Sequence, residues 1–152
     1  MNLNFKVRPF AELSLKELYE ILALRQSIFI VEQNCPYMDC DGKDFHALHL
    51  MGFTDEGKLA AYARIIEPGI SYPEVSIGRV VTATTYRKFG LGRQLMAEAL
   101  RVAKENYGDV DVRIGAQRYL LKFYADFGFE TGEPYIEDGI DHNIMLRKGI
   151  ST

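Results

Sequence analysis

The chain has 152 residues, 47% of them hydrophobic, and a formal net charge of −3. This length and composition predict one domain, residues 1–152, with a substantial core, and the acidic balance argues against nucleic acid as the main partner. No apolar run reaches the length of a membrane span, and the N-terminus lacks the hydrophobic region of a signal peptide, so we expect a cytoplasmic protein without membrane contact.

The first half of the chain predicts a strand, a helix and a run of strands. A short strand is expected at residues 5–10. A helix follows from Ser14, which can form a capping box with Glu17, and runs to about Ile30. Residues 34–44 contain proline and glycine and predict a loop. Strands are then expected at residues 46–54, 58–66 and 75–84.

The second half alternates strands and helices. From Leu91 to about Asn106 the apolar residues share one face, which predicts an amphipathic helix. Another helix is expected before Gly128, a residue type common just after a helix end. Strands are expected at 108–116 and 141–148. This order favours an α/β protein with both antiparallel and parallel strand pairs.

Residues 84–96, TTYRKFGLGRQLM, place two glycines and several cations at a predicted helix start. Each glycine costs about 1 kcal/mol against alanine in a helix, and a cation near the N-terminus opposes the dipole by about 0.3–1 kcal/mol. A bound anion would offset these costs, because exposed N–H groups and the dipole would both point at it. A solvated basic turn explains the same residues, and a short glycine motif does not decide between them.

The hexapeptide from Arg87 to Gly92 resembles R-x-x-G-x-G, the acyl-CoA signature of the GNAT N-acetyltransferase superfamily. A strand is expected before it and a long amphipathic helix after it, as in that family. Residues 123–129, FYADFGF, resemble a second element of the family. Residues 24–44 and 135–147 resemble its ElaA-type branch, so that the resemblance covers nearly the whole chain.

The resemblance implies the GNAT acyltransferase fold: a mixed, mostly antiparallel sheet with a splayed parallel central pair and flanking helices. It implies acetyl-CoA as the acyl donor, with its pantetheine lying along strand backbone like an added strand. The diphosphate would be wrapped by the glycine-containing turn. The residues implied for the acyl-CoA are Val80, Val81, Thr82, Arg87, Lys88, Phe89, Gly90, Leu91, Gly92, Arg93 and Gln94.

The resemblance also places Tyr124 at the family's catalytic tyrosine position, where a hydroxyl can protonate the leaving thiolate. Tyr124 shares a helical face with Leu120, Phe123 and Phe127, so an ordinary aromatic at the edge of the core is the alternative.

A general base is not identifiable from the sequence. Glu32, His49, Asp138 and His142 are candidates by residue type. Glu32 could equally brace a loop, and His49 lies in a predicted strand, where a structural histidine is more common. Asp138 and His142 fall near a late loop that could line the acceptor entrance.

Cys35, Cys40, His46 and His49 invite a zinc interpretation, but their spacing differs from structural zinc sites, and an offset of three along a strand separates the two histidines. We therefore expect no metal, and no disulfide in a reducing cytosol. The acidic residues within 39–44 predict a solvated turn; an electronegative mouth for a cationic acceptor is the alternative.

Two classes of function fit these features. The first is an acetyl-CoA-dependent N-acetyltransferase that modifies a primary amine of a small molecule or protein, and the second is a non-catalytic acyl-CoA-binding or sensing module with the same fold. Only the enzyme releases CoA in the presence of an amine. A nucleic-acid binder using the cations of 87–93 is weakened by the acidic total charge. Exposed tyrosines and strand edges permit a homodimer without requiring one.

Overall fold

The computed structural model describes residues 1–149, which form two antiparallel sheets with strand orders β1-β2-β3-β4 and β5-β7-β6. The strands are β1 (Asn4–Pro9), β2 (Ala47–Phe53), β3 (Leu59–Ile66), β4 (Ser76–Thr82), β5 (Val112–Gln117), β6 (Phe129–Glu137) and β7 (Ile140–Arg147). The helices are α1 (Leu15–Arg25), α2 (Leu91–Tyr107) and α3 (Leu121–Ala125). Shorter helical segments are η1 (Phe10–Glu12), η2 (Gln26–Glu32), η3 (Lys43–His46), η4 (Thr84–Phe89) and η5 (Arg118–Leu120).

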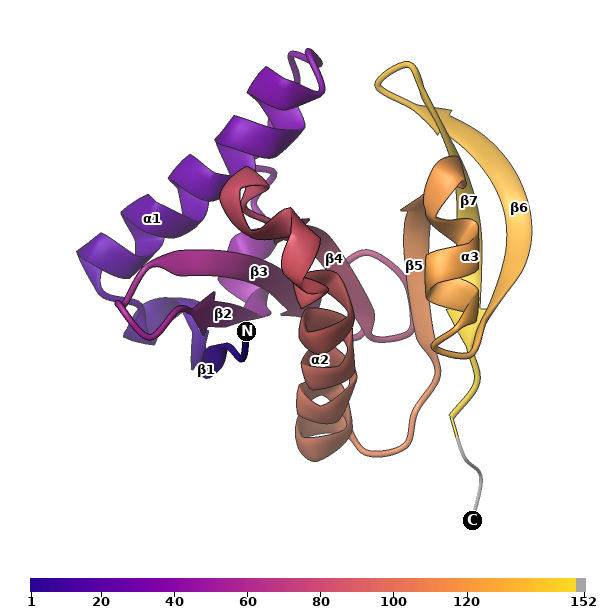
Figure 1. Cartoon of the computed structure of the whole chain (residues 1–152). Helices are drawn as coiled ribbons and strands as arrows, with labels where there is room; N and C mark the ends of the chain where they lie inside the picture. Colours follow the sequence, from indigo (N-terminus) through magenta and orange to yellow (C-terminus); the bar gives the residue numbers. More distant parts are fainter. Residues whose placement is uncertain (150–152) are drawn as a thin grey trace.

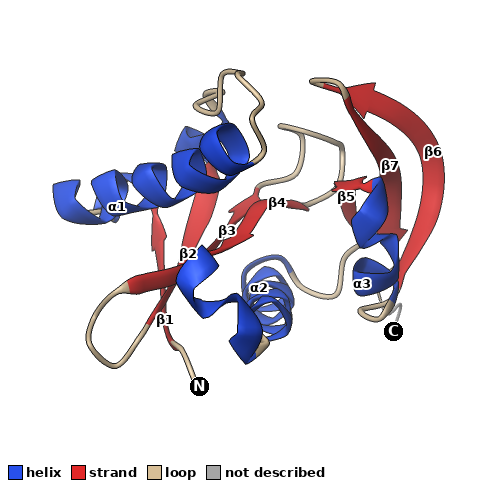
Figure 2. Ribbon diagram, turned by 45° about the horizontal axis from the view of Figure 1, so that its top comes forward, coloured by secondary structure: helices blue, strands red, loops and turns tan. Residues whose placement is uncertain are grey.

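The two sheets meet at β4 and β5, which lie parallel and touch at one end only (Figure 1). Val75, the residue before β4, forms a parallel bridge with Val112, the one bridge between the two sheets in residues 1–149, and the Arg113 N–H donates to the Val75 carbonyl at 2.9 Å. Beyond this point the strands separate, and Figure 2 shows the same opening from a second direction. The splayed parallel pair expected from the resemblance is therefore present.

A bulge in β4 accentuates the opening. The pairing of β3 with β4 shifts between Tyr62 and Arg64, and Arg79 adopts a left-handed backbone with φ of 50°. A bulge leaves an extra residue outside the ladder and turns the strand. The residues of β4 that follow Gly78, 79–82, line the cleft between the two sheets.

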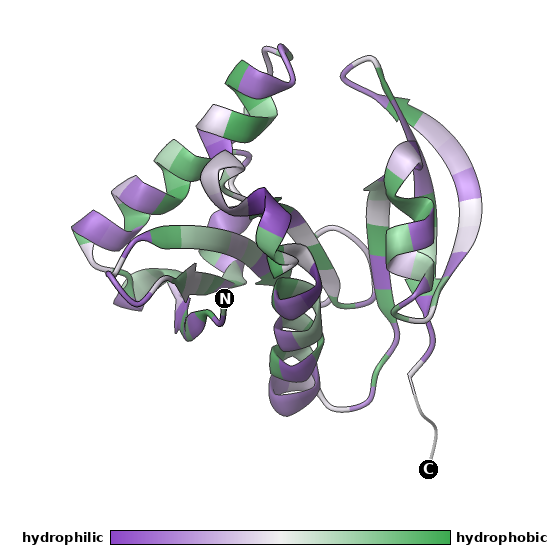
Figure 3. Ribbon diagram, in the orientation of Figure 1, coloured by the Kyte–Doolittle hydropathy of each residue, from purple (hydrophilic) through white to green (hydrophobic). Residues whose placement is uncertain are grey.

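Helix α2 covers β3 and β4 and supplies much of the main core. Figure 3 shows green and purple residues on different sides of this helix, as its sequence pattern predicts. Leu100, predicted within the apolar face, is only half-buried, whereas Val102 is buried. The buried residues of α2 are Leu91, Leu95, Met96, Ala99, Val102 and Ala103.

The predicted first helix is present and differs at its end. Ser14 and Glu17 form the expected capping box. The α-helix ends at Arg25 and continues as the π-helical η2, whose last turn includes a Gln33 N–H to Ile28 carbonyl bond of 3.0 Å. This wider winding carries the chain to Glu32. No helix in the described part of the chain is long and apolar enough to cross a membrane.

Strand β6 was missed by the sequence analysis. Only Phe129 of β6 is buried, and Gly132 and Pro134 interrupt any alternation of apolar residues. The turn that follows, Asp138–Gly139, has positive φ at both residues and is the tight hairpin turn that Asp-Gly favours.

The predicted strand 108–116 was also too long at its start, because Gly108 with φ of 82° ends α2 and β5 begins only at Val112.

Candidate active site

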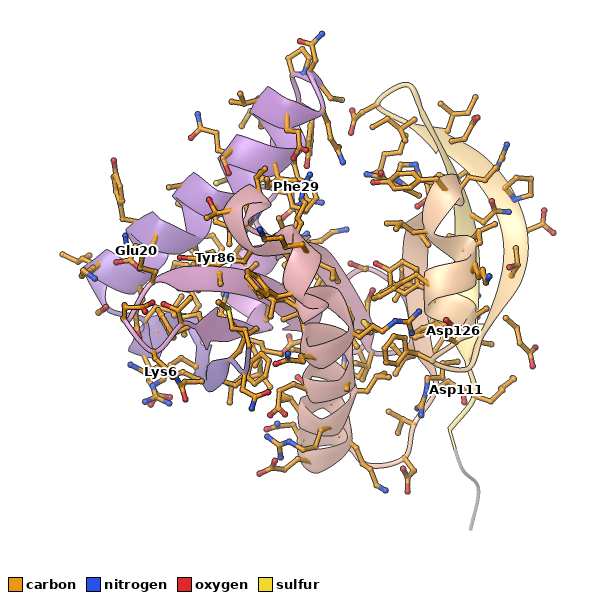
Figure 4. The ribbon with its side chains drawn as sticks, viewed as in Figure 1. Lys6, Glu20, Phe29, Tyr86, Asp111 and Asp126 are labelled. Atoms are coloured by element: carbon orange, nitrogen blue, oxygen red, sulfur yellow. The ribbon has the colours of Figure 1, made fainter. Side chains whose placement is uncertain are left out.

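A cleft of about 850 Å³ opens between β4 and β5. Ile114 and Gly115, which point to opposite faces of β5, both line it, so the cleft passes through the gap between the sheets. Phe29, labelled in Figure 4, lines it from η2. The cleft brings together eight of the residues that the sequence analysis singled out for the acyl-CoA or for catalysis: Val80, Val81, Thr82, Arg87, Gly92, Tyr124, Asp138 and His142.

The start of α2 is free of any side-chain cap. Gly90 is the N-cap residue, with φ of 69°, a conformation that a side chain would strain, and it makes no capping hydrogen bond. No acidic residue lies in the first turn. A Cβ at Gly92 would meet only the Phe123 ring, at 3.8 Å, so this position leaves room at the cleft wall. An anion at this turn would meet uncapped N–H groups and the positive end of the helix dipole.

Two of the three cations of the turn are already ion-paired with protein carboxylates, whereas Lys88 lies 5.7 Å from the centre of the Phe89 ring and has no ion pair among the described residues. Arg87 forms a two-pronged ion pair with Glu32, and Arg93 binds Asp126 at 2.9 Å while lying 5.6 Å from the centre of the Phe123 ring. Asp126 is seen beside α3 in Figure 4. The amide of Gln94 holds the N-terminal segment, accepting from Leu3 N–H and donating to the Met1 carbonyl. Arg87 and Arg93 would have to leave these ion pairs to reach a phosphate at this turn, whereas the backbone N–H groups and Lys88 would not.

Tyr124 lies on α3 and is 7% exposed where it lines the cleft. Its ring packs edge-on against Phe123 and Phe129, with centroids 5.1 and 5.9 Å away. Burial raises the pKa of the hydroxyl to about 12, with a smaller contribution from Tyr119. Tyr124 is therefore a neutral phenol at physiological pH and can donate a proton.

Two of the four candidate bases are committed elsewhere. Glu32 is exposed, and its hydrogen bond from Arg87 lowers its pKa, which makes it a poorer proton acceptor. The His49 ring is buried, with Nε2 2.9 Å from the Asp44 carbonyl and Nδ1 2.7 Å from the Tyr62 hydroxyl. A carbonyl only accepts, so Nε2 carries the hydrogen and Nδ1 accepts from Tyr62. Burial lowers the pKa of His49, and its role is structural.

The acidic loop is not the solvated turn that the sequence predicted. Asp39, Asp41 and Asp44 form ion pairs with three arginines from other elements, Arg25, Arg64 and Arg79. Arg25 is fully buried and Arg64 is 3% exposed. The sequence analysis missed this network because its arginines lie in α1, β3 and β4, far from the loop in sequence. The network fixes the loop against the cleft wall at Asp41, Lys43 and Arg64.

The cysteines and His46 do not come together with His49 as a metal site. Cys35 is buried and its Sγ donates to the Asp138 carbonyl at 3.4 Å, while Cys40 is exposed, and both are free thiols. His46 lies 3.3 Å from Glu67. Within residues 1–149 no cluster of three or more His, Cys, Asp or Glu side chains could hold a metal ion.

An aromatic wall closes the cleft on the side of β6 and β7. Tyr135 stacks on His142, with centroids 5.1 Å apart, and extends its hydroxyl toward Gly115. A Cβ at Gly115 would lie 2.0 Å from the Tyr135 hydroxyl and 3.3 Å from that of Tyr72. Any side chain at this position of β5 would therefore have to displace the Tyr135 phenol. Burial is the main cause of the raised pKa of both tyrosines, which stay neutral.

The comparisons with known proteins agree with this geometry. A family model for the acetyltransferase (GNAT) domain matches residues 40–148. The chain belongs to the GNAT acetyltransferase family. A UPF0039 protein of Synechocystis sp. is 42% identical over 96% of both chains. An acyl-CoA N-acyltransferase from Pseudomonas aeruginosa superposes with a TM-score of 0.90 at 42% identity, covering 95% of this chain and 99% of that one.

Escherichia coli ElaA superposes on this GNAT domain with a TM-score of 0.88 at 39% identity, covering 96% of this chain and 99% of ElaA. The resemblance to the GNAT fold and to its ElaA-type branch is thus confirmed. The protein is an acyltransferase of the acyl-CoA-dependent class. Its residues fit such a cosubstrate, because the cleft offers an uncapped helix start and open space at Gly92.

Proposed function

We propose that this GNAT enzyme transfers an acetyl group from acetyl-CoA to a primary amine. The proposal rests on one observation: the uncapped start of α2, the bulged backbone of β4 and the neutral Tyr124 phenol border the same cleft. Each matches one part of an acyl-CoA: a diphosphate, an amide-bearing arm and a thioester.

In this proposal the backbone of Val80, Val81 and Thr82 pairs with the pantetheine amides like an added strand. The N–H groups of the turn from Arg87 to Gln94 hold the diphosphate. Both groups of contacts are mainly backbone, which agrees with the prior engagement of Arg87 and Arg93 in ion pairs.

The transfer needs a neutral amine and a protonated leaving group. A free alkylamine resembles lysine, with a pKa near ~10.4, so it must lose a proton before it attacks the thioester carbon. As the carbon–sulfur bond breaks, the Tyr124 hydroxyl donates a proton to the sulfur. The surrounding Phe123 and Phe129 rings exclude water and keep this phenol neutral.

Calorimetric titration of acetyl-CoA tests the cofactor half of the proposal, with Gly92→Glu and Gly92→Ala as a matched pair. Gly92→Ala adds a methyl group at ordinary contact distance, whereas Gly92→Glu directs a carboxylate at the proposed diphosphate site. We expect at least about 10-fold weaker binding for Gly92→Glu, the equivalent of ~1.4 kcal/mol, and milder weakening for Gly92→Ala. Equal affinity of the Gly92→Glu variant and the parent would refute this site.

Release of free thiol from acetyl-CoA tests the transfer itself. A panel of amines would include a diamine, an α-amino acid, an amino sugar and a lysine-containing peptide. We expect thiol release with at least one class and mass spectrometry showing one added acetyl group on its nitrogen. Tight acetyl-CoA binding without thiol release for any amine would instead favour the non-catalytic acyl-CoA-binding module.

A further inference from the structure

His142 occupies the cleft-facing side of β7. It is 8% exposed, and its partners in the strand register are Gln117 on β5 and Tyr135 on β6. Residues directly opposite each other in antiparallel strands share a face, so His142 lies on the same face as the aromatic wall. The Tyr135 ring spans the distance from His142 to Gly115, at the edge of the gap between the sheets.

The tautomer of His142 follows from its backbone contact. Its Nδ1 lies 2.7 Å from the carbonyl oxygen of Ile140, and a carbonyl can only accept a hydrogen bond. Nδ1 therefore carries the hydrogen, and in the neutral ring Nε2 keeps an unshared pair. His49 is in the opposite tautomer, because its Nε2 donates to the Asp44 carbonyl.

Nε2 of His142 faces another proton acceptor. The nearest carboxylate oxygen, Oε2 of Glu137, is 3.9 Å away, too far for a hydrogen bond. Neither atom has a hydrogen to offer the other when the imidazole is neutral. A donor placed between these two acceptors could bind both of them. An ammonium group has three N–H donors, so it can donate to Nε2 and to Oε2 at the same time.

The neighbouring charges favour the same ligand. Glu137 has no ion pair other than this contact with His142 among the described residues. Asp138, at the tip of the same hairpin, also lines the cleft. The arginines that face the cleft at Arg64 and Arg79 are neutralised by the aspartates of the loop. Glu137 and Asp138 therefore place two carboxylates beside His142, and Lys43 is the one cleft-lining cation without an ion pair among the described residues.

We propose that His142 Nε2 and the Glu137 carboxylate bind the ammonium group of the acceptor, and that His142 is the general base of the transfer. This inference rests on the proposed function. The ammonium group first gives one proton to Nε2, directly or over one water molecule, and Nε2 releases it to solvent, so that a neutral amine attacks the thioester carbon. As the nitrogen–carbon bond forms, the nitrogen gives its second proton to Nε2. The carbon–sulfur bond breaks, the Tyr124 proton goes to sulfur, and solvent returns a proton to the Tyr124 phenolate. Glu137 stabilises the imidazolium until it releases its proton to solvent.

The first test uses the protein alone. Nitrogen-15 chemical shifts of the histidine rings at about pH 8 should show His142 with hydrogen on Nδ1 and none on Nε2, and His49 with the reverse. A His142 ring that carries hydrogen on Nε2 at this pH would overturn the assignment of the base. This readout needs neither acetyl-CoA nor an acceptor, so it decides the tautomer whatever becomes of the proposed transfer.

The second test compares His142→Gln with His46→Gln, the same change at a half-exposed histidine outside the cleft. Using the amine that gives the fastest thiol release, we expect His142→Gln to lower kcat by about 10²-fold, the low end of general base catalysis. The dissociation constant of acetyl-CoA should stay within about twofold. His46→Gln should leave both unchanged. Parent-like kcat in His142→Gln would overturn the proposal.

Two further variants separate catalysis from positioning. Added imidazole should restore part of the turnover of His142→Ala, which a merely structural role would not allow. Glu137→Gln should raise KM for the amine more than it lowers kcat, with Glu133→Gln on the same strand as its control. An unchanged KM in Glu137→Gln would remove the carboxylate from the acceptor site. A parent enzyme inactive with every amine would contradict the proposed function instead.

Discussion

Arg87 at the end of η4 is paired through both guanidinium NH groups with the Glu32 carboxylate at the end of η2, 55 residues earlier in the chain. The pair joins the turn that precedes α2 to the segment that follows α1. It also places a carboxylate beside the proposed diphosphate site. In the proposed site, Glu32 would thus compete with the diphosphate for the same guanidinium.

Replacing Glu32 should therefore strengthen acyl-CoA binding. Glu32→Gln removes the negative charge and frees Arg87 to face the diphosphate. Exposed ion pairs contribute about 0–1 kcal/mol, so we expect the dissociation constant of acetyl-CoA to fall by up to about fivefold at low salt. The gain should shrink as salt is added, because both charges are exposed.

Calorimetry at two salt concentrations measures this effect. Glu98→Gln is a suitable control, because it removes the same charge from α2 next to Arg101, away from the start of the helix. Its dissociation constant should match the parent. Weaker acetyl-CoA binding by Glu32→Gln would mean that the ion pair holds the turn in its binding shape rather than competing with the ligand.

Tyr124→Phe should leave acyl-CoA binding intact and slow the transfer. The Tyr124 ring packs against phenylalanine rings, so the change removes only the hydroxyl group and leaves the packing of the ring as it is. We expect kcat to fall by about 10²-fold, as for other positioned proton donors, with an unchanged dissociation constant for acetyl-CoA. Steady-state thiol release and calorimetry measure the two quantities.

The control for this change is Tyr19→Phe, which alters an exposed tyrosine on α1 outside the cleft. It should behave as the parent. If Tyr124→Phe turned over at the parental rate, the leaving thiolate would have to obtain its proton from another group, and Tyr124 would be an aromatic of the core edge.

The sequence predicted a helix or strand correctly where its hydrophobic residues recur with the period of that element and those residues are the buried ones. Helix α2 is an example, because its apolar face packs on β3 and β4 and its sequence shows the matching period. Strand β6 escaped prediction because most of its residues are exposed and its stability comes from pairing with β7. Pairing of this kind leaves no hydrophobic period in a single strand.

The candidate site likewise has one part that the sequence could predict and one part that it could not. The turn from Arg87 to Gly92 is a contiguous motif, and the sequence alone could point to it. The placement of two acceptors, His142 Nε2 and the Glu137 carboxylate, 3.9 Å apart depends on strand register and on a ring tautomer set by the Ile140 carbonyl. Neither is encoded in residue spacing, so the sequence could name His142 only by residue type.

Removing one carboxylate of the buried network should destabilise the protein strongly. Oδ1 of Asp44 accepts from Arg25 at 2.7 Å and from Arg64 at 3.0 Å. Asp44→Asn removes the carboxylate that both buried guanidinium groups share. Removing one partner of a buried ion pair typically lowers the free energy of unfolding by about 3–5 kcal/mol. Urea unfolding measures the change, with the exposed Asp55→Asn as control. A loss below about 1 kcal/mol would show that the network is well solvated.

The same carboxylates should make the fold sensitive to acid. Burial alone would raise the pKa of Asp44 and Asp41, but the neighbouring arginines outweigh it and hold each pKa below its usual value. Groups of this kind stabilise the folded state above the ordinary aspartate pKa of about 3.9, and their contribution is lost as pH falls below it. The unfolding free energy of the parent should drop steeply there, and that of Asp44→Asn less steeply.

Gly115→Ala should disturb the acceptor side of the cleft through Tyr135. The added Cβ would stand 2.0 Å from the Tyr135 hydroxyl, so the phenol must move away from its place beside Tyr72. Because Tyr135 stacks on His142, we expect a higher KM for the amine, a lower melting temperature and unchanged acetyl-CoA affinity. The double variant Gly115→Ala, Tyr135→Phe removes the colliding oxygen and leaves the ring carbon and the Tyr72 hydroxyl, each at 3.3 Å. Its melting temperature should therefore lie closer to that of Tyr135→Phe alone than additivity would give. Strictly additive effects would show that Gly115 and Tyr135 act independently, and that the contact does not shape the wall.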